Sequence, residues 1–586
     1  MVKFKWFKTT LITAALFSTS ALAFEPQSQR EDREPEAATG LQAKQAVTTK
    51  DYMVVAAHPL ASRVGYNILK KGGTAIDAAI AVQVMLTLVE PQSSGIGGGA
   101  FILYWDKKKR ALTTYDGRET APAAADSDLF LKKDGTPVSW REAIVGGRSV
   151  GVPGVLAALK MAHDKHGHLP WKELFSDTIR IAEKGFRVSP RLAKLVSLEL
   201  NPGVEKISGT RQYFYPDSYP IKENYKLKNQ ALADVYKTIA SEGIEPFYRG
   251  DIAKQIVETV QRSPIAPGKL SLDDMANYKP VEREPLCSTY REYKVCGMDT
   301  PSSGGFAVLQ MLSILEPFEL SKRDFLNTQT LHLFTQSSRL AFADRDKYVA
   351  DSDFVQVPKE GLLDKQYLQE RAKLIDLHVD MGKASPGNPA GATAMVEGDA
   401  YELPSTSHIS IVDKYGNALS MTTSIEMAFG SGLMSQGFLL NNQLTDFSLS
   451  PKKDGKWVAN RVEPNKRPRS SMSPIMVFDK YGNLKLVVGS PGGSRIINYV
   501  AQTVLGVLDW KLNPQEAINL PRITNRNKVT TLEKGTDIER FKSSLEAKGH
   551  KVFVRDLNSG IHAIEVKSKS LVGGADPRRE GKVLGD

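Results

Sequence analysis

The sequence has few cysteines and no long apolar segment after its first residues. Only Cys287 and Cys296 are present among 586 residues, which excludes a disulfide-rich scaffold and a metal site built from clustered cysteines. The most apolar later window, residues 75–89, contains Asp77 and Gln83 and is expected to be a buried helix. The mature chain is therefore expected to have no stable membrane span.

Long runs of one charge are missing as well. The formal net charge of +11 comes from basic residues spread along the chain, which is typical of a solvated surface and not of an arm that binds nucleic acid. The glycine run at residues 93–99 precedes a strand-like segment and not a helix, the reverse of a nucleotide-binding turn. With 41% hydrophobic and 24% charged residues, the composition is that of a globular protein.

The amino terminus has the order of a secretory signal. Three lysines precede the apolar residues 11–17, and Ala21-Leu22-Ala23 follows as a cleavage site. An anchoring helix is the alternative, but it needs about twenty apolar residues. We therefore expect a signal peptide over residues 1–23, a flexible leader over 24–50, and secretion, into the periplasm of a bacterium.

The two cysteines flank Tyr290-Arg291, and this spacing suits a disulfide across a hairpin in an oxidising compartment. Two unpaired thiols fit the sequence nearly as well. The pairing of Cys287 with Cys296 stays open at this point.

The chain changes character at a linker. The fold is expected to start near Tyr52, and residues from about 151 to 375 read mainly as helices. Residues 381–404 are rich in Gly, Pro, Ala and Ser and have no hydrophobic period, as in a functional loop. Two antiparallel hairpins and two helices are expected to follow: strands at 408–412, 418–423, 475–478 and 484–488, and helices at 496–508 and 514–520.

The linker runs into Ser405-Thr406-Ser407-His408 at the head of the first of these strands. A threonine hydroxyl is a weak nucleophile unless a base takes its proton, and an amino-terminal threonine carries that base as its own α-amino group. Cleavage before Thr406 would create both groups together. Clusters of Ser and Thr at strand starts are, however, more often local hydrogen-bonding devices, so this pattern alone does not establish a nucleophile.

Nine short motifs, in order along the chain, give this threonine a context: residues 94–99, 116–122, 150–154, 301–305, 406–408, 439–443, 446–448, 468–474 and 489–495. Together they resemble the γ-glutamyltranspeptidases, also called glutathione hydrolases, over nearly the whole mature chain. The resemblance implies an α+β fold, the four-layer αββα sandwich of the N-terminal nucleophile hydrolases. It also implies one precursor that cuts itself into a large subunit, residues 51–405, and a small catalytic subunit, residues 406–586, which form an intertwined heterodimer.

The same resemblance implies a mechanism without a metal or an organic cofactor. Thr406 first attacks the carbonyl of Ser405 and later the γ-carbonyl of a glutamyl donor such as glutathione, and water or an amino acid resolves the acyl-enzyme. Ser424 is implied to orient the new amine. The backbone N–H groups of Gly492 and Gly493 are implied to stabilise the oxyanion, since glycine allows close approach.

Six residues are implied to bind the substrate. A forked cation and two hydroxyls would hold the α-carboxylate, and carboxylate and amide groups would hold the α-ammonium: Arg118, Ser470 and Ser471 for the former, Gln443 and Asp446 for the latter, with Glu426 beside them. Ser424 and Glu426 stand where many members have threonine and asparagine. Serine keeps the hydroxyl, whereas glutamate adds a carboxylate near the ammonium site.

Because of Glu426, other substrate classes remain as alternatives. Relatives with this fold hydrolyse glutaryl side chains of β-lactams, as cephalosporin acylases do, or act on poly-γ-glutamate. A periplasmic amino-acid-binding protein without catalysis is an alternative of another class, since it also needs an Arg for carboxylate and an Asp for ammonium. It gives no role to the linker that meets Thr406. A γ-glutamyltransferase acting on small molecules remains our first prediction.

Overall fold

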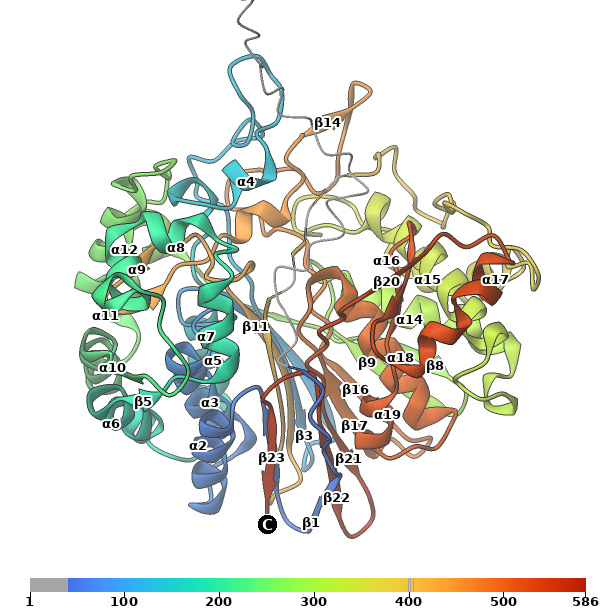
Figure 1. The fold of residues 1–586 in the computed structure, drawn as a ribbon, viewed down its shortest axis with the longest axis horizontal. Helices are drawn as coiled ribbons and strands as arrows, with labels where there is room; N and C mark the ends of the chain where they lie inside the picture. Colours follow the sequence, from blue (N-terminus) through green and yellow to red (C-terminus); the bar gives the residue numbers. More distant parts are fainter. Residues whose placement is uncertain (1–39, 399, 401, 404) are drawn as a thin grey trace, which may run out of the picture. The chain divides into compact units, whose positions relative to one another are not determined.

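The computed structural model describes residues 40–398, 400, 402, 403 and 405–586, so the expected signal peptide and most of the expected leader lie outside the described residues. Two seven-stranded sheets lie face to face between two layers of helices (Figure 1). The expectation of a four-layer α+β sandwich is confirmed. The first sheet has the order β1 (Val47–Thr49), β22 (Leu571–Ala575), β21 (His562–Val566), β17 (Leu484–Gly489), β16 (Ile475–Phe478), β9 (Tyr293–Gly297) and β8 (Leu286–Tyr290).

The second sheet contains the strand that follows the linker. Its order is β23 (Lys582–Gly585), β2 (Met53–Ala56), β10 (Ser407–Val412), β11 (Ala418–Ser424), β3 (Gly99–Asp106), β4 (Ala111–Gly117) and β7 (Val281–Arg283). All its paired strands are antiparallel. Smaller sheets pair β5 (Phe186–Arg187) with β6 (Lys226–Leu227), β12 (Met434–Ser435) with β13 (Phe438–Leu439), β14 (Lys452–Lys453) with β15 (Lys456–Trp457), and β18 (Ile523–Asn525) with β19 (Thr530–Glu533) and β20 (Val552–Arg555).

Each large sheet is covered by its own group of helices. Over the second sheet lie α2 (Pro59–Lys70), α3 (Ala75–Val89), α5 (Val155–His166), α6 (Ser176–Lys184) and α10 (Gln230–Glu242), and over the first lie α14 (Gly304–Leu315), α15 (Thr328–Tyr348), α18 (Ile496–Leu508) and α19 (Pro514–Asn519) (Figure 1). Further helices complete the layers: α4 (Trp140–Ala143), α7 (Pro190–Ser197), α8 (Pro202–Lys206), α9 (Ser208–Phe214), α11 (Glu245–Tyr248), α12 (Asp251–Gln261), α13 (Leu272–Asn277), α16 (Lys359–Leu363), α17 (Lys365–Ala372) and α20 (Lys542–Glu546).

The helices and hairpins begin and end at signals that the sequence carries. Thr74 caps α3 through a reciprocal pair of hydrogen bonds with Asp77, which satisfies two N–H groups of the first turn. Asp413 closes the β10–β11 turn by accepting hydrogen bonds from the N–H groups of Tyr415 and Asn417. Asp479 does the same in the β16–β17 turn. The two predicted hairpins are therefore confirmed.

The centre of the sandwich contains polar side chains between the two sheets. Ile409 and Ile411 of β10 point into the helix-covered core, while His408 and Ser410 face the opposite sheet. The Ser410 hydroxyl donates to the carbonyl oxygen of His562 (3.0 Å), and the rings of His408 and His562 stack at 6.3 Å. These contacts connect β10 to the opposite sheet, so its position is fixed from that side as well.

The fold starts earlier than we expected. β1, at residues 47–49, belongs to the expected leader, yet it pairs with β22 near the carboxyl end. Its partner lies more than 500 residues away in sequence, so no local pattern could reveal the pairing. The open question of the cysteines has an answer too: Cys287 and Cys296 face each other on β8 and β9 and form a disulfide.

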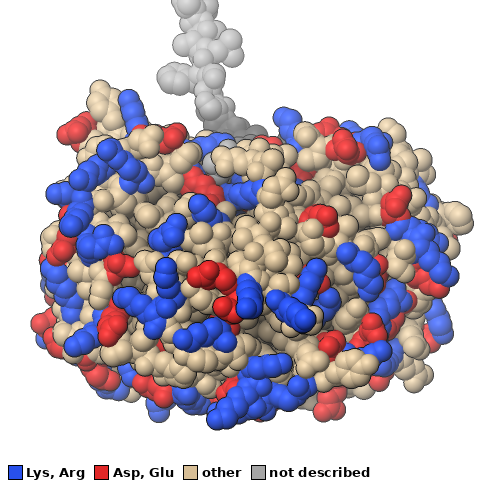
Figure 2. All heavy atoms as spheres, turned by 90° about the horizontal axis from the view of Figure 1, so that it is seen from below, with Lys and Arg blue, Asp and Glu red and all other residues tan. Residues whose placement is uncertain are grey.

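On one face of the molecule the surface charge is mixed, as the sequence suggested. On the face seen from below, Lys and Arg side chains are spread widely with Asp and Glu between them (Figure 2). Among the described residues, no helix has both the length and the apolar character needed to cross a membrane.

Because the two sheets are in close contact at Gly489, we expect any side chain there to lower the stability of the fold. A β-carbon built there would lie 2.2 Å from Cε1 of His408, a ring that packing holds in place. We expect Gly489→Ala to lower the stability by about 1–3 kcal/mol through overpacking, seen as a lower apparent melting temperature. Gly209→Ala is the control, because nothing lies within 4 Å of a β-carbon at that position in α9. Equal stability of the two variants would contradict this account of the interface.

Candidate active site

Thr406 lies at the head of β10, where the linker enters the sheet. It is 4% exposed, and its hydroxyl donates to Ser424 Oγ, at the end of the adjacent β11, over 3.0 Å. The N–H of Glu426 also donates to Ser424 Oγ (2.9 Å). The Ser424 hydroxyl is therefore held in place by the N–H of Glu426, and it lies where it can orient groups on Thr406.

The carbonyl between linker and strand is already polarised. The N–H of Gly492 donates to the carbonyl oxygen of Ser405 over 3.1 Å. Gly492 has φ 132°, a backbone conformation that L side chains rarely adopt, so glycine is required for this approach. Thr406 itself has φ 90°, which is strained for a β-branched residue. A nucleophile, a polarised carbonyl and local strain thus meet at one peptide bond.

A buried ion pair forms the next part of the site. Arg118 donates from Nη2 to Asp446 Oδ2 over 2.5 Å, and Gln443 donates to the same oxygen over 2.7 Å. Further side-chain hydrogen bonds of Arg118 go to the carbonyl oxygens of Pro468 (3.2 Å) and Arg469 (2.9 Å), and its Nη1 lies 3.6 Å from Glu119 Oε2. In this arrangement Arg118 holds the Asp446 side chain and the backbone at Pro468 and Arg469, which directly precede the two serines.

The acidic side chains of this cluster resist ionisation. Burial, partly offset by Arg118, raises the pKa of Asp446 to about 6. Burial and the neighbouring Asp446 raise the pKa of Glu426 well above its ordinary value. Among the described residues, Asp446 Oδ1, Glu426 Oε2 and Gln443 Oε1 are buried acceptors without a hydrogen-bond partner. Three unused acceptors beside two carboxyl groups are suited to a cation with several N–H donors.

The predicted residues come together in one small cavity. Its lining contains every predicted site residue except Gly492, which contacts the Ser405 carbonyl instead: Arg118, Thr406, Ser424, Glu426, Gln443, Asp446, Ser470, Ser471 and Gly493. Its volume is about 20 Å³, enough for a water molecule. The linker residues Glu402 and Leu403 lie in the same lining, so the chain itself occupies the space.

The sequence reasoning missed three charged residues here. Glu402 receives hydrogen bonds from Ser471 and Arg345, and Arg469 lies against it with Nε at 3.3 Å from Oε1. Arg469 lies inside the motif at 468–474, where only the serines had been assigned. Arg345 lies within α15 and carries no local signal.

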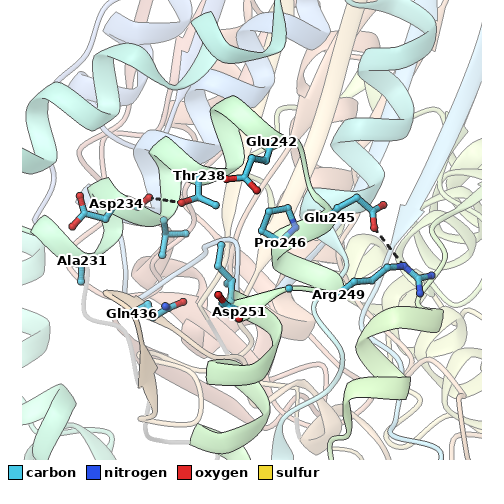
Figure 3. Close-up of a pocket in the computed structure, with 12 residues that line it drawn as sticks. Ala231, Asp234, Thr238, Glu242, Glu245, Pro246, Arg249, Asp251 and Gln436 are labelled. Carbon is cyan, nitrogen blue, oxygen red and sulfur yellow. Dashed lines mark hydrogen bonds and ion pairs between the residues drawn. The ribbon is translucent and has the colours of Figure 1, made fainter.

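A larger open hollow lies elsewhere. It has a volume of about 790 Å³ and is lined by residues of α10, α11 and α12, with Gln436 at its edge (Figure 3). Asp234 and Glu245 of its lining are bonded to neighbouring side chains or lie on the surface, and none of the predicted site residues contributes to it. The predicted site residues line the small cavity instead.

Comparison with known proteins agrees with this geometry. A model of the γ-glutamyltranspeptidase family matches residues 61–586. The chain belongs to this family. The glutathione hydrolase proenzymes of Bacillus subtilis (strain 168) and Escherichia coli (strain K12) are 39% and 38% identical to it, and each alignment covers 91–92% of both chains. Cephalosporin acylase from Bacillus halodurans, a solved structure, is 29% identical with a TM-score of 0.82 over 93% of this chain and 97% of its own.

Membership of the γ-glutamyltranspeptidase family makes the chain an enzyme and agrees with a threonine nucleophile. The two relatives are named as proenzymes, which agrees with a chain that is cut after synthesis. The match begins only eight residues after the strand β2 starts at Met53, so the family resemblance extends over nearly all of both sheets.

The buried Glu119, next to Arg118 in sequence, makes the stability of the protein depend on pH. It is fully buried, neither carboxyl oxygen has a hydrogen-bond partner among the described residues, and burial raises its pKa from 4.5 to about 8. Between these two pH values the unfolded chain loses this proton while the folded chain keeps it, so stability falls as the pH rises. This loss of stability is absent below about pH 4.5 and complete above about pH 8.

We expect Glu119→Gln, in the Thr406→Ala background that keeps the chain uncut, to lose less stability than its parent between about pH 5 and about pH 8. The difference amounts to a few kcal/mol at most, and urea unfolding at both pH values measures it. Glu205→Gln, at an exposed ion pair with Arg211, is the control for the substitution itself. A parallel loss in Glu119→Gln and its parent would contradict the assignment.

Proposed function

We propose that the chain is a γ-glutamyltransferase and glutathione hydrolase that cuts itself between Ser405 and Thr406. The observation that carries the proposal is the arrangement at this bond: the Thr406 hydroxyl bonded to Ser424, and the Ser405 carbonyl bonded to the N–H of Gly492. The names of its relatives support the substrate, since two of them are glutathione hydrolase proenzymes.

Self-cleavage is the first reaction. Thr406 Oγ1 adds to the carbonyl carbon of Ser405 as its proton leaves, and the N–H of Gly492 stabilises the oxyanion. The C–N bond then breaks, the Thr406 nitrogen takes a proton, and the resulting ester is hydrolysed by water. The strained φ of Thr406, which costs on the order of 1–3 kcal/mol, favours this step because the cut chain can relax.

Turnover uses the groups that cleavage creates. The free α-amine of Thr406 takes the hydroxyl proton while Oγ1 attacks the γ-carbonyl of the donor. The Ser424 hydroxyl, whose Oγ lies 3.0 Å from Thr406 Oγ1, orients that amine. The protonated amine then donates to the leaving nitrogen, and water or an amino acid resolves the ester by the same route in reverse. Gly492 and Gly493 serve the oxyanion in each step.

The unused acceptors around Asp446 suit the donor's α-ammonium. Glu426 Oε2, Gln443 Oε1 and Asp446 Oδ1 are buried and unpartnered, and an ammonium group has three N–H donors to offer. A bound cation would also favour ionisation of the two carboxyl groups whose pKa values burial raises. Ser470 and Ser471 line the same cavity, and the α-carboxylate is expected at their hydroxyls.

The two subunits would stay together after cleavage. β10 and β11 of the expected small subunit, residues 406–586, lie between β2 and β3 of the expected large subunit, residues 51–405, in one hydrogen-bonded sheet. Separation would break both ladders and expose their core. We further propose that the protein is secreted into the periplasm, on the basis of the signal-like residues 1–23.

Thr406→Ala tests the cleavage. Mature wild-type protein should give two bands on a denaturing gel, the smaller one corresponding to residues 406–586, and the variant should give one, because its nucleophile is missing. Thr423→Ala is the matched control: it removes a buried threonine hydroxyl from the neighbouring strand and should leave two bands. An intact wild-type chain would refute the mechanism.

Glutaryl transfer is the second candidate, favoured by the structural similarity to a cephalosporin acylase. A glutaryl group has no ammonium, so it would leave the acceptors of Asp446 and Glu426 empty. We expect kcat/KM for γ-glutamyl-p-nitroanilide to exceed that for glutaryl-p-nitroanilide by at least about tenfold, as charge-assisted hydrogen bonds of about 1.5–3 kcal/mol require. Glu426→Gln should reduce this ratio. If the wild-type enzyme preferred the glutaryl donor, glutaryl transfer would be the correct function.

A further inference from the structure

Five turns of the two large sheets lie at the end of the sandwich opposite Thr406 (Figure 1). The N–H of Lys107 donates to Asn417 Oδ1 over 3.0 Å, and Arg110 Nη2 donates to the carbonyl oxygen of Tyr481 over 2.7 Å, so neighbouring turns are in contact. Each of the five turns carries at least one lysine. We call the surface that they form the turn face: residues 50–51, 106–110, 413–417, 479–483 and 566–570.

A hollow opens on the turn face between the ends of the two sheets. Its volume is about 400 Å³, and its lining comes mainly from four of the five turns. Two serine hydroxyls belong to the lining, those of Ser568 and Ser570. Five exposed lysines surround it: Lys50, Lys107, Lys414, Lys567 and Lys569.

The lysines of the hollow have few carboxylates to pair with. Asp413 lines the hollow, but it is buried, and its oxygens accept hydrogen bonds from N–H groups of its own turn and of α3. Asp51 is the exposed acidic residue of the lining. Among the described residues, Lys567 is the one lysine of the hollow with an ion-pair partner, Glu565 at 3.5 Å. The hollow therefore carries an excess of positive charge.

This excess is local. Elsewhere at this end of the molecule Lys109 pairs with Asp106, and Lys480 pairs with Glu292. Figure 2 views this end from below and shows Asp and Glu side chains among the Lys and Arg side chains. A nucleic acid is bound by a long basic stripe, whereas one lysine-lined hollow fits a compact anionic group.

A repeated turn adds exposed tyrosines to the turn face. The sequence Asp-Lys-Tyr-Gly-Asn occurs at residues 413–417 in the second sheet and at 479–483 in the first. The turn geometry uses the Asp, Gly and Asn of this sequence and requires neither the Lys nor the Tyr. Tyr415 is 44% exposed and donates from its hydroxyl to the carbonyl oxygen of Gly72 (2.9 Å), whereas Tyr481 is 72% exposed. Both sheets thus present a lysine beside a tyrosine at the same end.

The surface of an anionic phospholipid bilayer offers the complementary chemistry. Lysines near such a surface are attracted to its phosphate groups, and tyrosine is enriched at the level of the headgroups, where its ring leaves water and its hydroxyl stays hydrated. A hollow of about 400 Å³ is large enough for one headgroup, since pockets for small ligands measure about 300–1,000 Å³. Neither feature has a use in the proposed catalysis.

We propose that the turn face docks the protein on an anionic phospholipid bilayer, with a lipid phosphate in the hollow and Tyr481 at the level of the headgroups. Thr406 precedes β10, and Val412 at the other end of this strand lines the hollow, so the two sites are roughly 20 Å apart. The active site would then face away from the bilayer and receive small molecules from solution. This contact is peripheral, and it does not depend on the proposed enzymatic function.

Vesicle sedimentation of the mature protein tests the docking. At low ionic strength, vesicles of phosphatidylglycerol and phosphatidylcholine in equal parts should carry the protein into the pellet. Vesicles of phosphatidylcholine alone should leave it in the supernatant. About 0.5 M NaCl should release the bound protein, because salt screens attraction between exposed charges.

Charge reversal tests the hollow. Lys414→Glu/Lys569→Glu should weaken binding to the anionic vesicles at least about twentyfold, since each lysine near such a surface contributes about fivefold in affinity. Lys133→Glu/Lys206→Glu is the control with the same net charge, and it should bind as wild type does. Both control lysines are exposed and outside the turn face: Lys133 lies in the loop before α4 and Lys206 ends α8, helices at the opposite end of the molecule (Figure 1).

Tyr481→Ser tests the contact with the headgroup level without a change of charge. It should weaken binding at least about threefold, because part of an apolar ring no longer leaves water. Tyr219→Ser is the matched control, since Tyr219 is also 72% exposed and lies outside the turn face. All variants should keep the wild-type apparent Tm, which excludes misfolding as the cause of a loss.

Inorganic phosphate distinguishes a lipid from a soluble anion. If phosphate raised the apparent Tm through Lys414 and Lys569 while anionic vesicles did not bind, the hollow would be a site for a soluble phosphate and the docking proposal would be wrong. Binding to neutral vesicles, or an equal loss in the charge-reversal variant and its control, would also overturn it. Sedimentation does not require turnover, so a failure of the proposed function would leave this result unaffected.

Discussion

The position of β10 determines the geometry of the site. This strand is paired on both sides, with β2 and β11, and its inner face contacts the opposite sheet through His408 and Ser410. A strand held on three sides cannot shift in register, because every side chain would change faces. Thr406 at its head is therefore fixed relative to Gly492, which follows the end of β17 in the opposite sheet. The linker can reach this point only across the cavity, which is why the uncut site is full.

Charge is the second constraint. The cavity brings arginines and carboxyl groups together with little water, so each charge depends on a specific partner. Burial and the charges of Arg345 and Arg469 act in opposite directions on Glu402, and the arginines prevail, since its pKa is lowered.

Much of the fold could be predicted from sequence because its elements carry local signals. Thr74 with Asp77 at the start of α3, and the repeated turn at Asp413 and Asp479, fix helix and hairpin positions within a few residues. β1 could not be predicted, since its partner β22 is distant in sequence. The site was found through family motifs, and so residues outside those motifs were missed. Arg345 on α15 and Glu402 in the linker reach the site only through the fold that places them against Ser471.

The unpartnered acceptors favour a glutamyl donor over a glutaryl donor on physical grounds. Both donors present a carboxylate, so a carboxylate-binding site cannot distinguish them. On the other side, Glu426 and Asp446 resist ionisation, and each has a buried oxygen without a partner. A glutaryl chain would cover these oxygens with methylene groups and leave them unsatisfied, at a cost of about 1–3 kcal/mol for each buried group. A glutamyl chain would satisfy them with its ammonium, so we propose that the ammonium side of the cavity, and Glu426 in particular, sets the specificity.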